Sequence, residues 1–386
     1  MKILHVIPSV SEGSGGPAQA IFPMLRALQA QGVEVLLITT DADLELNEIL
    51  PAQINYKNVP TLFFSSQLGN SFKYSRSLSV WLDENVAKFD LVHVHAVFNH
   101  ACIAAAKACR KFDVPYVVRP LGTLDPWSMQ QKRLKKRLFW AITGRSMLKN
   151  SAMVHYTSEA EKTRTESSLK LGRGVVVPLG VDSQRTDVLS DVSPGPGGLR
   201  KTPRPYVLVM SRLDPKKGLP LLIRSFLSLR NEERFSDWRL VIAGDGNPEY
   251  RDHLENIVRE ANATNLVEFT GWLNGDQKIS YLQNAELLAL TSYQENFGIC
   301  VMEAMAYGVP VLVSPHVDLS MEVLQANAGW VVEVDELSIT KGLDEALSSK
   351  EERNCRGKAG QEVAKAFSWD RIGADLIHMY SEISAR

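Results

Sequence analysis

The sequence predicts an α/β fold made of two Rossmann-like domains that face each other across a cleft. Short apolar runs alternate with longer segments of helical period, which is typical of parallel strands covered by helices on both faces. The alternation stops at the glycine- and proline-rich stretch 193–198 and then starts again. A length of 386 residues is ample for two domains, each with its own core.

The first half is predicted to contain four strands, with a helix between the first two. The helix is expected over 17–31, where Ile21, Leu25 and Leu28 recur on one face. Runs rich in Val, Ile and Leu predict buried strands. These runs lie at 3–7, 33–38, 91–94 and 116–118.

The second half repeats this pattern of strands and helices. Its strands are expected at 206–210, 240–243, 287–290 and 309–313. Its helices are expected near 218–230, 249–261 and 299–307. Sheets of this kind bind ligands beyond the carboxyl ends of their strands, so the cleft between the domains is the expected site.

The composition argues against several classes of protein. Lys plus Arg is 43 and Asp plus Glu is 44, a net charge of −1, which argues against a nucleic-acid partner bound through overall positive charge. The four cysteines form no C-x-x-C pair, which argues against a disulfide framework or a cysteine-rich zinc site. Because the chain shows neither a signal-peptide pattern nor an apolar run of about 18 residues, we expect a cytoplasmic protein.

A glycine-rich loop follows the first strand. Residues 13–18 match the pattern G-x-G-x-x-A at the start of the helix, where glycines allow close backbone approach and N–H groups can meet an anion. Alone, this pattern indicates NAD(P) binding, with Asp41 or Asp43 as the ribose partner. The loop is longer than a dinucleotide turn needs, so two alternatives stay open. One is a flexible strand–helix loop, and the other is a loop that approaches a donor phosphate or sugar from the facing domain.

The second half carries a stronger signal. Glu295 and Glu303 have seven residues between them, with the first expected on a loop after a strand and the second on the following helix. The N–H groups at the start of that helix suit a diphosphate or sugar hydroxyls, and carboxylates accept hydrogen bonds from vicinal hydroxyls. Arg212 and Lys217 also follow a strand, and they would neutralise the charge on a leaving nucleotide.

These motifs resemble those of the retaining glycosyltransferases of family four, which have the GT-B fold, and in particular bacterial exopolysaccharide-type enzymes. The matching segments span most of the chain in the family's order. They lie at 177–182, 211–213, 217–218, 241–246, 269–273, 295–310 and 367–370.

The resemblance implies a role for individual residues. Glu295 would bind the hydroxyls of the donor sugar, and Glu303 would hold the ribose. Arg212 and Lys217 would stabilise the diphosphate leaving group, so that these two cations and Glu295 are the candidate catalytic residues of the donor domain. The other donor-binding residues would be Gly15, Gly16, Gly246, Leu273, Asn296, Phe297, Gly298 and Ile299.

The resemblance also implies domain roles and a reaction. An N-terminal acceptor domain would cover 1–185 and take in a crossing helix at about 366–386, and a donor domain would cover 186–365. The reaction would be a retaining transfer of a hexose, first guess glucose from UDP-glucose, to a saccharide or lipid-linked saccharide in polysaccharide biosynthesis. GDP-mannose and UDP-galactose stay open as donors. An NAD(P)-dependent oxidoreductase and a non-catalytic module that binds nucleotide sugars stay open as other functions.

No metal or other cofactor is expected in this reaction. Asp41 and Asp43 form a D-x-D, the signature of a different glycosyltransferase fold that holds a divalent ion. Here the D-x-D lies just after the second strand and far in sequence from the donor motifs. We interpret it as a solvated turn.

One histidine is a further candidate catalytic residue. His95 follows a predicted strand and could reach into the cleft, although a structural histidine is as good an interpretation. His93 would point the same way because it precedes His95 by two. Relatives often carry a histidine where this chain has Leu121, so we expect Arg119 or Thr123 to contact ligand there instead.

A basic segment stands out in this nearly neutral chain. Five of the six residues from 132 to 137 are Lys or Arg, and Leu134 and Leu138 could form an apolar face beside them. Such a segment can rest on an anionic membrane, which predicts peripheral contact through 132–140 at the inner face of the plasma membrane. The alternative is a surface helix whose apolar face packs on its own domain.

Overall fold

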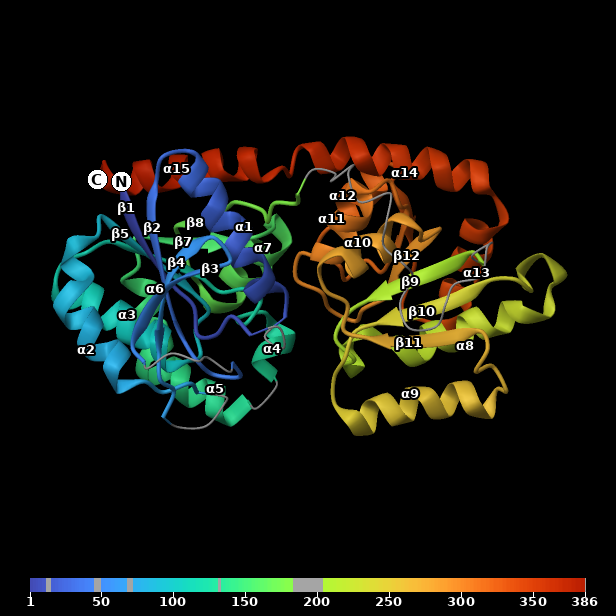
Figure 1. The fold of residues 1–386 in the computed structure, drawn as a ribbon, viewed down its shortest axis with the longest axis horizontal. Coiled ribbons are helices and arrows are strands. Elements are labelled where there is room, and N and C mark those ends of the chain that lie inside the picture. Colours follow the sequence, from blue (N-terminus) through green and yellow to red (C-terminus); the bar gives the residue numbers. More distant parts are fainter. Residues whose placement is uncertain (12–14, 45–49, 68–71, 131–132, 183–203, 386) are drawn as a thin grey trace. The chain divides into compact units, whose positions relative to one another are not determined.

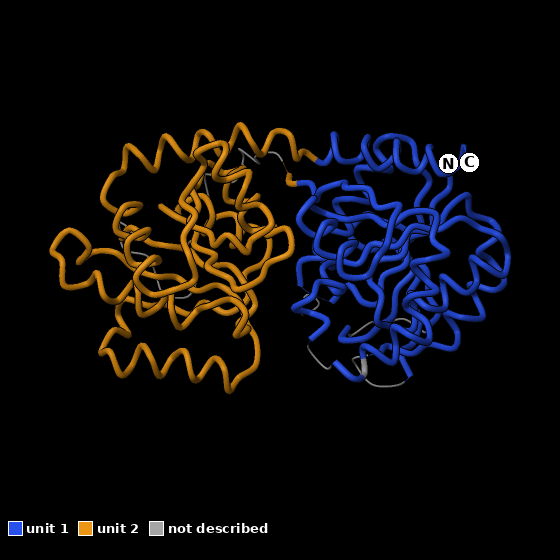
Figure 2. Tube along the Cα trace, turned by 180° about the vertical axis from the view of Figure 1, so that it is seen from behind, with its two compact units in different colours: residues 1–180, 369–386 blue, residues 181–368 orange. Residues whose placement is uncertain are grey.

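A computed structural model describes residues 1–11, 15–44, 50–67, 72–130, 133–182 and 204–385 (Figure 1). The chain divides into two compact units, coloured separately in Figure 2. Unit 1 is Met1–Gly180 with Trp369–Arg386, and unit 2 is Val181–Ser368. The stretch 193–198, predicted to lie in a boundary loop, falls outside the described residues.

Unit 1 is built on an eight-stranded sheet with the order β3-β4-β2-β1-β5-β6-β7-β8. Neighbouring strands are parallel except for β3, which is antiparallel to β4. The strands are β1 (Lys2–Val6), β2 (Glu34–Thr40), β3 (Ala52–Tyr56), β4 (Val59–Phe64), β5 (Leu91–His95), β6 (Tyr116–Arg119), β7 (Met153–Tyr156) and β8 (Gly174–Val176).

Helices cover both faces of this sheet, because its strands are apolar on both sides. The α-helices of unit 1 are α1 (Gly16–Ala30), α2 (Arg76–Asn85), α3 (His100–Lys111), α4 (Pro126–Gln130), α5 (Arg133–Phe139), α6 (Arg145–Lys149), α7 (Glu159–Leu169) and α15 (Trp369–Ser384). Leu4 and Val6 face a core formed with α2, α3 and α6. Ile3 faces a second core, formed with α1 and α15. The last helix therefore packs on the first unit, which the resemblance had implied.

Unit 2 has a six-stranded parallel sheet with the order β11-β10-β9-β12-β13-β14. Its strands are β9 (Tyr206–Met210), β10 (Arg239–Ala243), β11 (Val267–Gly271), β12 (Leu287–Leu290), β13 (Val311–Val313) and β14 (Gly329–Val331). The first strand of this unit, β9, lies between β10 and β12, so the order of strands reverses between β9 and β12. In open α/β sheets a ligand binds at such a reversal, outside the carboxyl ends of the strands.

Helices also cover both faces of the second sheet (Figure 1). The α-helices of unit 2 are α8 (Leu219–Ser228), α9 (Pro248–Glu260), α10 (Gly275–Gln283), α11 (Ile299–Ala306), α12 (Ser320–Gln325), α13 (Glu336–Ser348) and α14 (Lys350–Lys365). Side chains of α8, α9 and α13 share one core with the sheet. Among the described helices of the whole chain, none has the length and apolar character needed to cross a membrane.

Candidate functional site

The loops that follow β9 and β12 pack against each other at the strand reversal of unit 2. The backbone N–H of Tyr293 donates to the carbonyl of Lys216 over 2.8 Å. Gly218 has φ +67°, and a Cβ at this position would lie 2.5 Å from the Thr291 carbonyl oxygen. Only glycine combines this backbone conformation with so close an approach.

Lys217 and Glu295 meet where these loops join. The Lys217 ammonium donates a hydrogen bond to the Glu295 carboxylate, and the two form an ion pair. The lysine side chain is 8% exposed and the glutamate side chain 17% exposed, so both charges are largely withdrawn from water. Burial and the neighbouring cations Lys216 and Arg212 lower the pKa of Lys217. The contact with Glu295 acts in the opposite direction, because a neighbouring carboxylate favours the charged ammonium.

The segment after Glu295 leads into helix α11 as the sequence predicts. Glu295 is fixed by backbone hydrogen bonds to the loop after β13, with its N–H donating to the His316 carbonyl over 3.0 Å. Gly298 precedes α11 with φ +86° and provides no side-chain cap. Since no cap shields it, the positive end of the α11 dipole is available to an anion.

Phe297 differs from the other residues of this segment. Its side chain is only 1% exposed and lies 6.2 Å from the ring of Phe367, centroid to centroid. The aromatic ring is therefore part of the core, and Phe297 can offer a ligand only its backbone. The residues that border it keep their predicted places, with Asn296 before it and Gly298 and Ile299 at the start of α11.

Glu303, the second glutamate of the motif, is paired with a lysine that the sequence analysis did not single out. Lys278 on α10 donates to the Glu303 carboxylate on α11 over 2.6 Å. Both side chains are about one-fifth exposed, at 20% and 21%. Each glutamate of the motif therefore has its own lysine partner, drawn from a different loop or helix.

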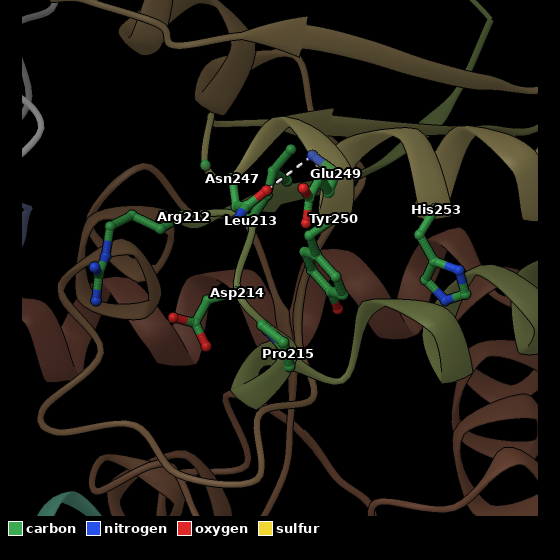
Figure 3. Close-up of a pocket in the computed structure, with 9 residues that line it drawn as sticks. Arg212, Leu213, Asp214, Pro215, Asn247, Glu249, Tyr250 and His253 are labelled. Carbon is green, nitrogen blue, oxygen red and sulfur yellow. Dashed lines mark hydrogen bonds between the residues drawn. The ribbon is translucent and has the colours of Figure 1, made fainter. Parts of the chain in front are cut away.

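Arg212 and Gly246 line one pocket beside this site (Figure 3). Leu213 between them donates its backbone N–H to the Asp245 carbonyl over 2.9 Å, which joins the loops after β9 and β10. In Figure 3 the Arg212 side chain extends to one side of Tyr250 and His253 lies on the other. The pocket is lined by Arg212, Leu213, Asp214, Pro215, Gly246, Asn247, Glu249, Tyr250 and His253.

Leu273 lies further along the same edge of the sheet. It follows β11, which is separated from β9 by β10. At a strand spacing of about 4.8 Å, the ends of β11 and β12 are about 14 Å apart across the sheet. The predicted donor residues of unit 2 therefore follow four neighbouring strands rather than a single loop.

In unit 1 the glycine-rich loop is described only in part. Gly13 and Ser14 lie outside the described residues. Gly15 has φ +81° and immediately precedes α1, which begins at Gly16 without a side-chain cap. The predicted approach of Gly15 and Gly16 to donor phosphates stays a prediction.

The D-x-D segment has partners within its own unit. Asp41 accepts a hydrogen bond from the backbone N–H of Ser66 over 2.7 Å, and Asp43 forms an ion pair with Lys73 at 3.1 Å. Asp43 also has φ +63°, as in a tight turn. These contacts support the interpretation of the segment as a turn, and they compete with its use as a ribose or metal ligand.

Of the two interpretations of His95, its surroundings fit a structural histidine. Its imidazole is 1% exposed and lies in the core rather than at a surface. His93 does point the same way, with the two ring centroids 4.2 Å apart. The strand β5 continues through His95, which places the side chain within the sheet and argues against direct contact with a ligand.

His95 is one of four buried histidines that form a hydrogen-bonded layer. His155 Nε2 donates to the Val177 carbonyl over 2.7 Å, so His155 Nδ1 accepts from His93 Nε2 at 3.2 Å. His93 Nδ1 then accepts from the Tyr380 hydroxyl of α15 at 2.8 Å. His5 Nδ1 and His95 Nε2 lie 3.1 Å apart. No sequence motif marks His5, His155 or Tyr380 as members of this layer.

This layer is the one group of His, Cys, Asp and Glu side chains within the described residues that could gather around a metal ion. Ring nitrogens of His5, His93 and His95 lie within 4.8 Å of one another. The buried guanidinium of Arg119 lowers the pKa of these imidazoles, after the larger effect of burial itself. A cation already next to the cluster disfavours a second one, so we interpret the layer as a polar part of the core.

Arg119 and Thr123, the other candidates of unit 1, are also engaged or buried. Arg119 is 2% exposed, and its Nη1 lies 3.5 Å from the sulfur of Met24. Thr123 donates its hydroxyl to the Pro120 carbonyl over 2.6 Å. Arg119 is therefore buried, and the Thr123 hydroxyl is already engaged with the backbone of its own loop.

Comparisons with known proteins agree with this architecture. A family profile described as "Glycosyl transferase 4-like domain" matches 15–180, and one described as "Glycosyl transferases group 1" matches 197–363. An uncharacterised glycosyltransferase of Methanocaldococcus jannaschii is 33% identical over 177 residues, which are 45% of this chain and 44% of that protein. The chain thus spans less than half the length of that relative.

Two solved structures share the fold over nearly their whole length. Sucrose-phosphate synthase from Thermosynechococcus elongatus has a TM-score of 0.77 at 20% identity, covering 100% of this chain and 99% of that one. HepE from Anabaena, solved in complex with UDP and glucose, has a TM-score of 0.76 at 19% identity, covering 99% of each chain. Identities this low show a common fold and leave the substrate of this chain open.

Proposed function

This chain belongs to the GT-B glycosyltransferases of the family-four type, and from that premise we propose that it transfers a hexose from a nucleotide diphosphate sugar with retention at the anomeric carbon. UDP-glucose is the proposed donor. The proposed acceptor is a saccharide or a lipid-linked saccharide in polysaccharide biosynthesis.

The observation that carries this proposal is the paired arrangement of Lys217 and Glu295 at the strand reversal of unit 2. An ammonium has three N–H donors, and the contact with Glu295 uses one of them. The two remaining N–H groups can donate to phosphate oxygens that reach the uncapped start of α11. The same pair then offers a cation to the diphosphate and a carboxylate to the sugar hydroxyls.

The lysine contacts also distinguish this site from that of a glycosidase. A glycosidase needs one protonated carboxyl group as a general acid, with a raised pKa. Glu295 and Glu303 each form an ion pair with a lysine ammonium, so neither carboxyl group is placed as a free general acid. Carboxylate oxygens also accept hydrogen bonds from hydroxyl groups, and the proposed roles are Glu295 for the donor sugar and Glu303 for the ribose.

The proposed reaction breaks the bond between the anomeric carbon and the phosphate oxygen and forms a bond from the same carbon to the acceptor oxygen. The acceptor proton passes to the leaving phosphate. Lys217 and the N–H groups at the start of α11, with Arg212 nearby, would stabilise the charge that develops on that phosphate. The prediction that no metal ion takes part stays a prediction.

A UDP-sugar is the first donor to test, ahead of GDP-mannose. HepE, which shares the fold, was solved with UDP and glucose. A thermal-shift panel with UDP, GDP, ADP and NAD, followed by hydrolysis assays with UDP-glucose, UDP-galactose and GDP-mannose, tests the choice. Stabilisation by UDP and release of UDP from UDP-glucose are expected, whereas stabilisation by GDP alone would move the proposal to GDP-mannose.

The same panel separates the two other functions. A response to NAD alone would indicate an NAD(P)-dependent oxidoreductase, although Asp41 and Asp43, the candidate ribose partners, are engaged with Ser66 and Lys73. Binding of UDP-glucose without any turnover, in the presence of candidate acceptors, would indicate a non-catalytic module.

A further inference from the structure

A row of large apolar side chains is exposed on unit 1. Helix α5 continues without a break through a π-helical turn, η3 (Trp140–Gly144), into α6. Leu134, Leu138 and Ile142 on this continuous helix are 83%, 64% and 67% exposed. Residues four apart lie on one face of a helix, so the three side chains form one ridge.

The π-helical turn helps to keep the ridge straight. Four residues of an α-helix turn the chain by about 400°, so a side chain four positions further on is rotated by about 40° around the helix axis. A π turn takes more residues than an α turn, and Arg145 closes it by donating its N–H to the Trp140 carbonyl. The step from Leu138 to Ile142 crosses this π turn, so Ile142 is rotated less around the helix axis relative to Leu138 than in a regular α-helix.

The opposite side of the same helix packs on its own unit. Phe139 and Trp140 are partly buried against the core, and the ring of Phe139 lies 5.1 Å from that of Phe98. Lys136 donates to the Ser128 carbonyl over 2.7 Å and lies 5.2 Å from the Phe98 ring centroid. The buried side of the helix therefore packs against the core of unit 1, whereas the exposed ridge takes no part in that core.

The charged residues of the segment that carries the ridge have one sign. Residues 126–158 include seven Lys or Arg and no Asp or Glu, although the whole chain has 43 basic and 44 acidic residues. Arg133, Arg137, Arg145 and Lys149 are exposed along the helix. An apolar ridge with purely basic flanks matches an anionic lipid surface, in which apolar side chains enter the acyl boundary and cations meet headgroups.

We propose that Leu134, Leu138 and Ile142, with the basic side chains beside them, dock unit 1 on an anionic membrane surface. A second copy of the chain is a poorer occupant, because it would bring two sets of basic side chains together. The proposal does not rest on the proposed transferase activity, because docking is measured without turnover.

Vesicle flotation of the full chain tests the proposal. Vesicles of phosphatidylcholine alone are compared with vesicles that also contain phosphatidylglycerol, at about 0.05 M and about 0.5 M salt, between which the screening length shortens several-fold. The full chain is expected to float with the anionic vesicles at low salt. Equal flotation with neutral vesicles at both salt concentrations, or no flotation, would overturn the proposal.

Two variants assign the effect to the ridge. The triple variant Leu134→Ser, Leu138→Ser, Ile142→Ser is expected to lose flotation about tenfold or more, as three inserted side chains would require. The matched control is Met321→Ser, Leu324→Ser, Leu337→Ser in unit 2, whose side chains are 55%, 59% and 81% exposed. This control is expected to float like the unchanged protein.

Three further measurements keep the outcomes apart. Unchanged thermal unfolding would show that the exposed serines leave the fold intact. Unchanged UDP release from UDP-glucose by the ridge variant would show that the loss of docking leaves catalysis intact. If the ridge variant floats as well as the control, or if the ridge instead joins two copies that the variant separates in gel filtration, membrane docking by this ridge is wrong.

Discussion

Lys217 and Glu295 form an ion pair whose two charges have different roles in the proposed reaction. Replacing Glu295 by Gln keeps the shape of the side chain but removes the charge that is proposed to receive the sugar hydroxyls. Since hydrogen bonds to charged groups contribute about 1.5–3 kcal/mol, turnover of UDP-glucose is expected to fall about 10- to 100-fold. Steady-state UDP release measures this. Glu351→Gln, at an exposed position of α14, is the matched control and should leave the rate unchanged.

Lys278 is expected to act on the donor only through Glu303. In Lys278→Met the Glu303 carboxylate loses the ammonium that holds it at 2.6 Å, so its position for the proposed contact with the ribose is less fixed. We predict a KM for UDP-glucose raised about tenfold, the loss of one modest charge-assisted contact, with kcat nearly unchanged. A fall in kcat with unchanged KM would instead indicate contact between Lys278 and the reacting groups.

The residues of the site could be predicted from the sequence only where a motif follows a strand. Glu295 and Lys217 do so, and the structure brings them together across a sheet reversal. Lys278 is 25 positions from Glu303 on a different helix, a separation that no local pattern marks. His95 follows a predicted strand and could have reached into a cleft or been structural, and α15 covers that face of the sheet. Because α15 comes from the far end of the chain, no local pattern near His95 indicates this burial.

At the scale of elements, the close packing of the strand-end loops depends on Gly218. In Gly218→Ala the new Cβ would meet the Thr291 carbonyl oxygen while the backbone stays at φ +67°. A loss of about 2 kcal/mol or more in unfolding free energy is expected. Gly271→Ala is the control, because Gly271 has φ +73° but nothing within 4 Å of the added Cβ. Chemical denaturation should show a clearly smaller loss there.

Elements with a continuous apolar run could be predicted almost to the residue. The strands expected at 206–210 and 287–290 are β9 and β12, and the helix expected near 299–307 is α11. The expected strands left out β4, β7 and β8 of unit 1 and β11 and β14 of unit 2. They also left out β3, whose alternate residues are exposed at the edge of its sheet. The lack of a continuous apolar run removes the signal by which a buried strand is recognised.

At the scale of the whole molecule, the buried histidines predict sensitivity to acid. Burial lowers the pKa of His5 and His155 to about 3, and lowers that of His93 and His95 well below 6.5. Below about pH 6.5 the unfolded chain binds protons that the folded chain does not. The unfolding free energy should therefore fall as the pH falls, by up to about 1.4 kcal/mol per pH unit for each histidine.

Thermal unfolding between about pH 7.5 and pH 5 measures this slope. The variant His5→Gln removes one buried imidazole, so its melting temperature should fall less steeply with pH than that of the unchanged protein. His253→Gln, an exposed position of unit 2, should not change the slope. Equal slopes for all three proteins would show that protonation of this layer does not control acid stability.

The sequence also predicted the division into two α/β units and the family, because both halves repeat the strand–helix pattern and the motifs follow the family's order. The net charge of −1 gave no indication of the exposed ridge on α5 and η3, since the exposure of Leu134, Leu138 and Ile142 depends on which side of the helix the core covers. Charge totals average over such local surfaces.

In the proposed reaction, Lys217 binds the donor diphosphate and Glu295 binds the donor hexose. Calorimetric titration of UDP into the unchanged protein, Lys217→Met and Glu295→Gln tests these roles most directly. UDP has the diphosphate but no hexose, so Lys217→Met should bind it about 10- to 100-fold more weakly than the unchanged protein. Glu295→Gln removes the carboxylate that favours the charged ammonium, so it should weaken UDP binding as well, but less than Lys217→Met does. Equal UDP affinity in Lys217→Met and the unchanged protein would contradict the account.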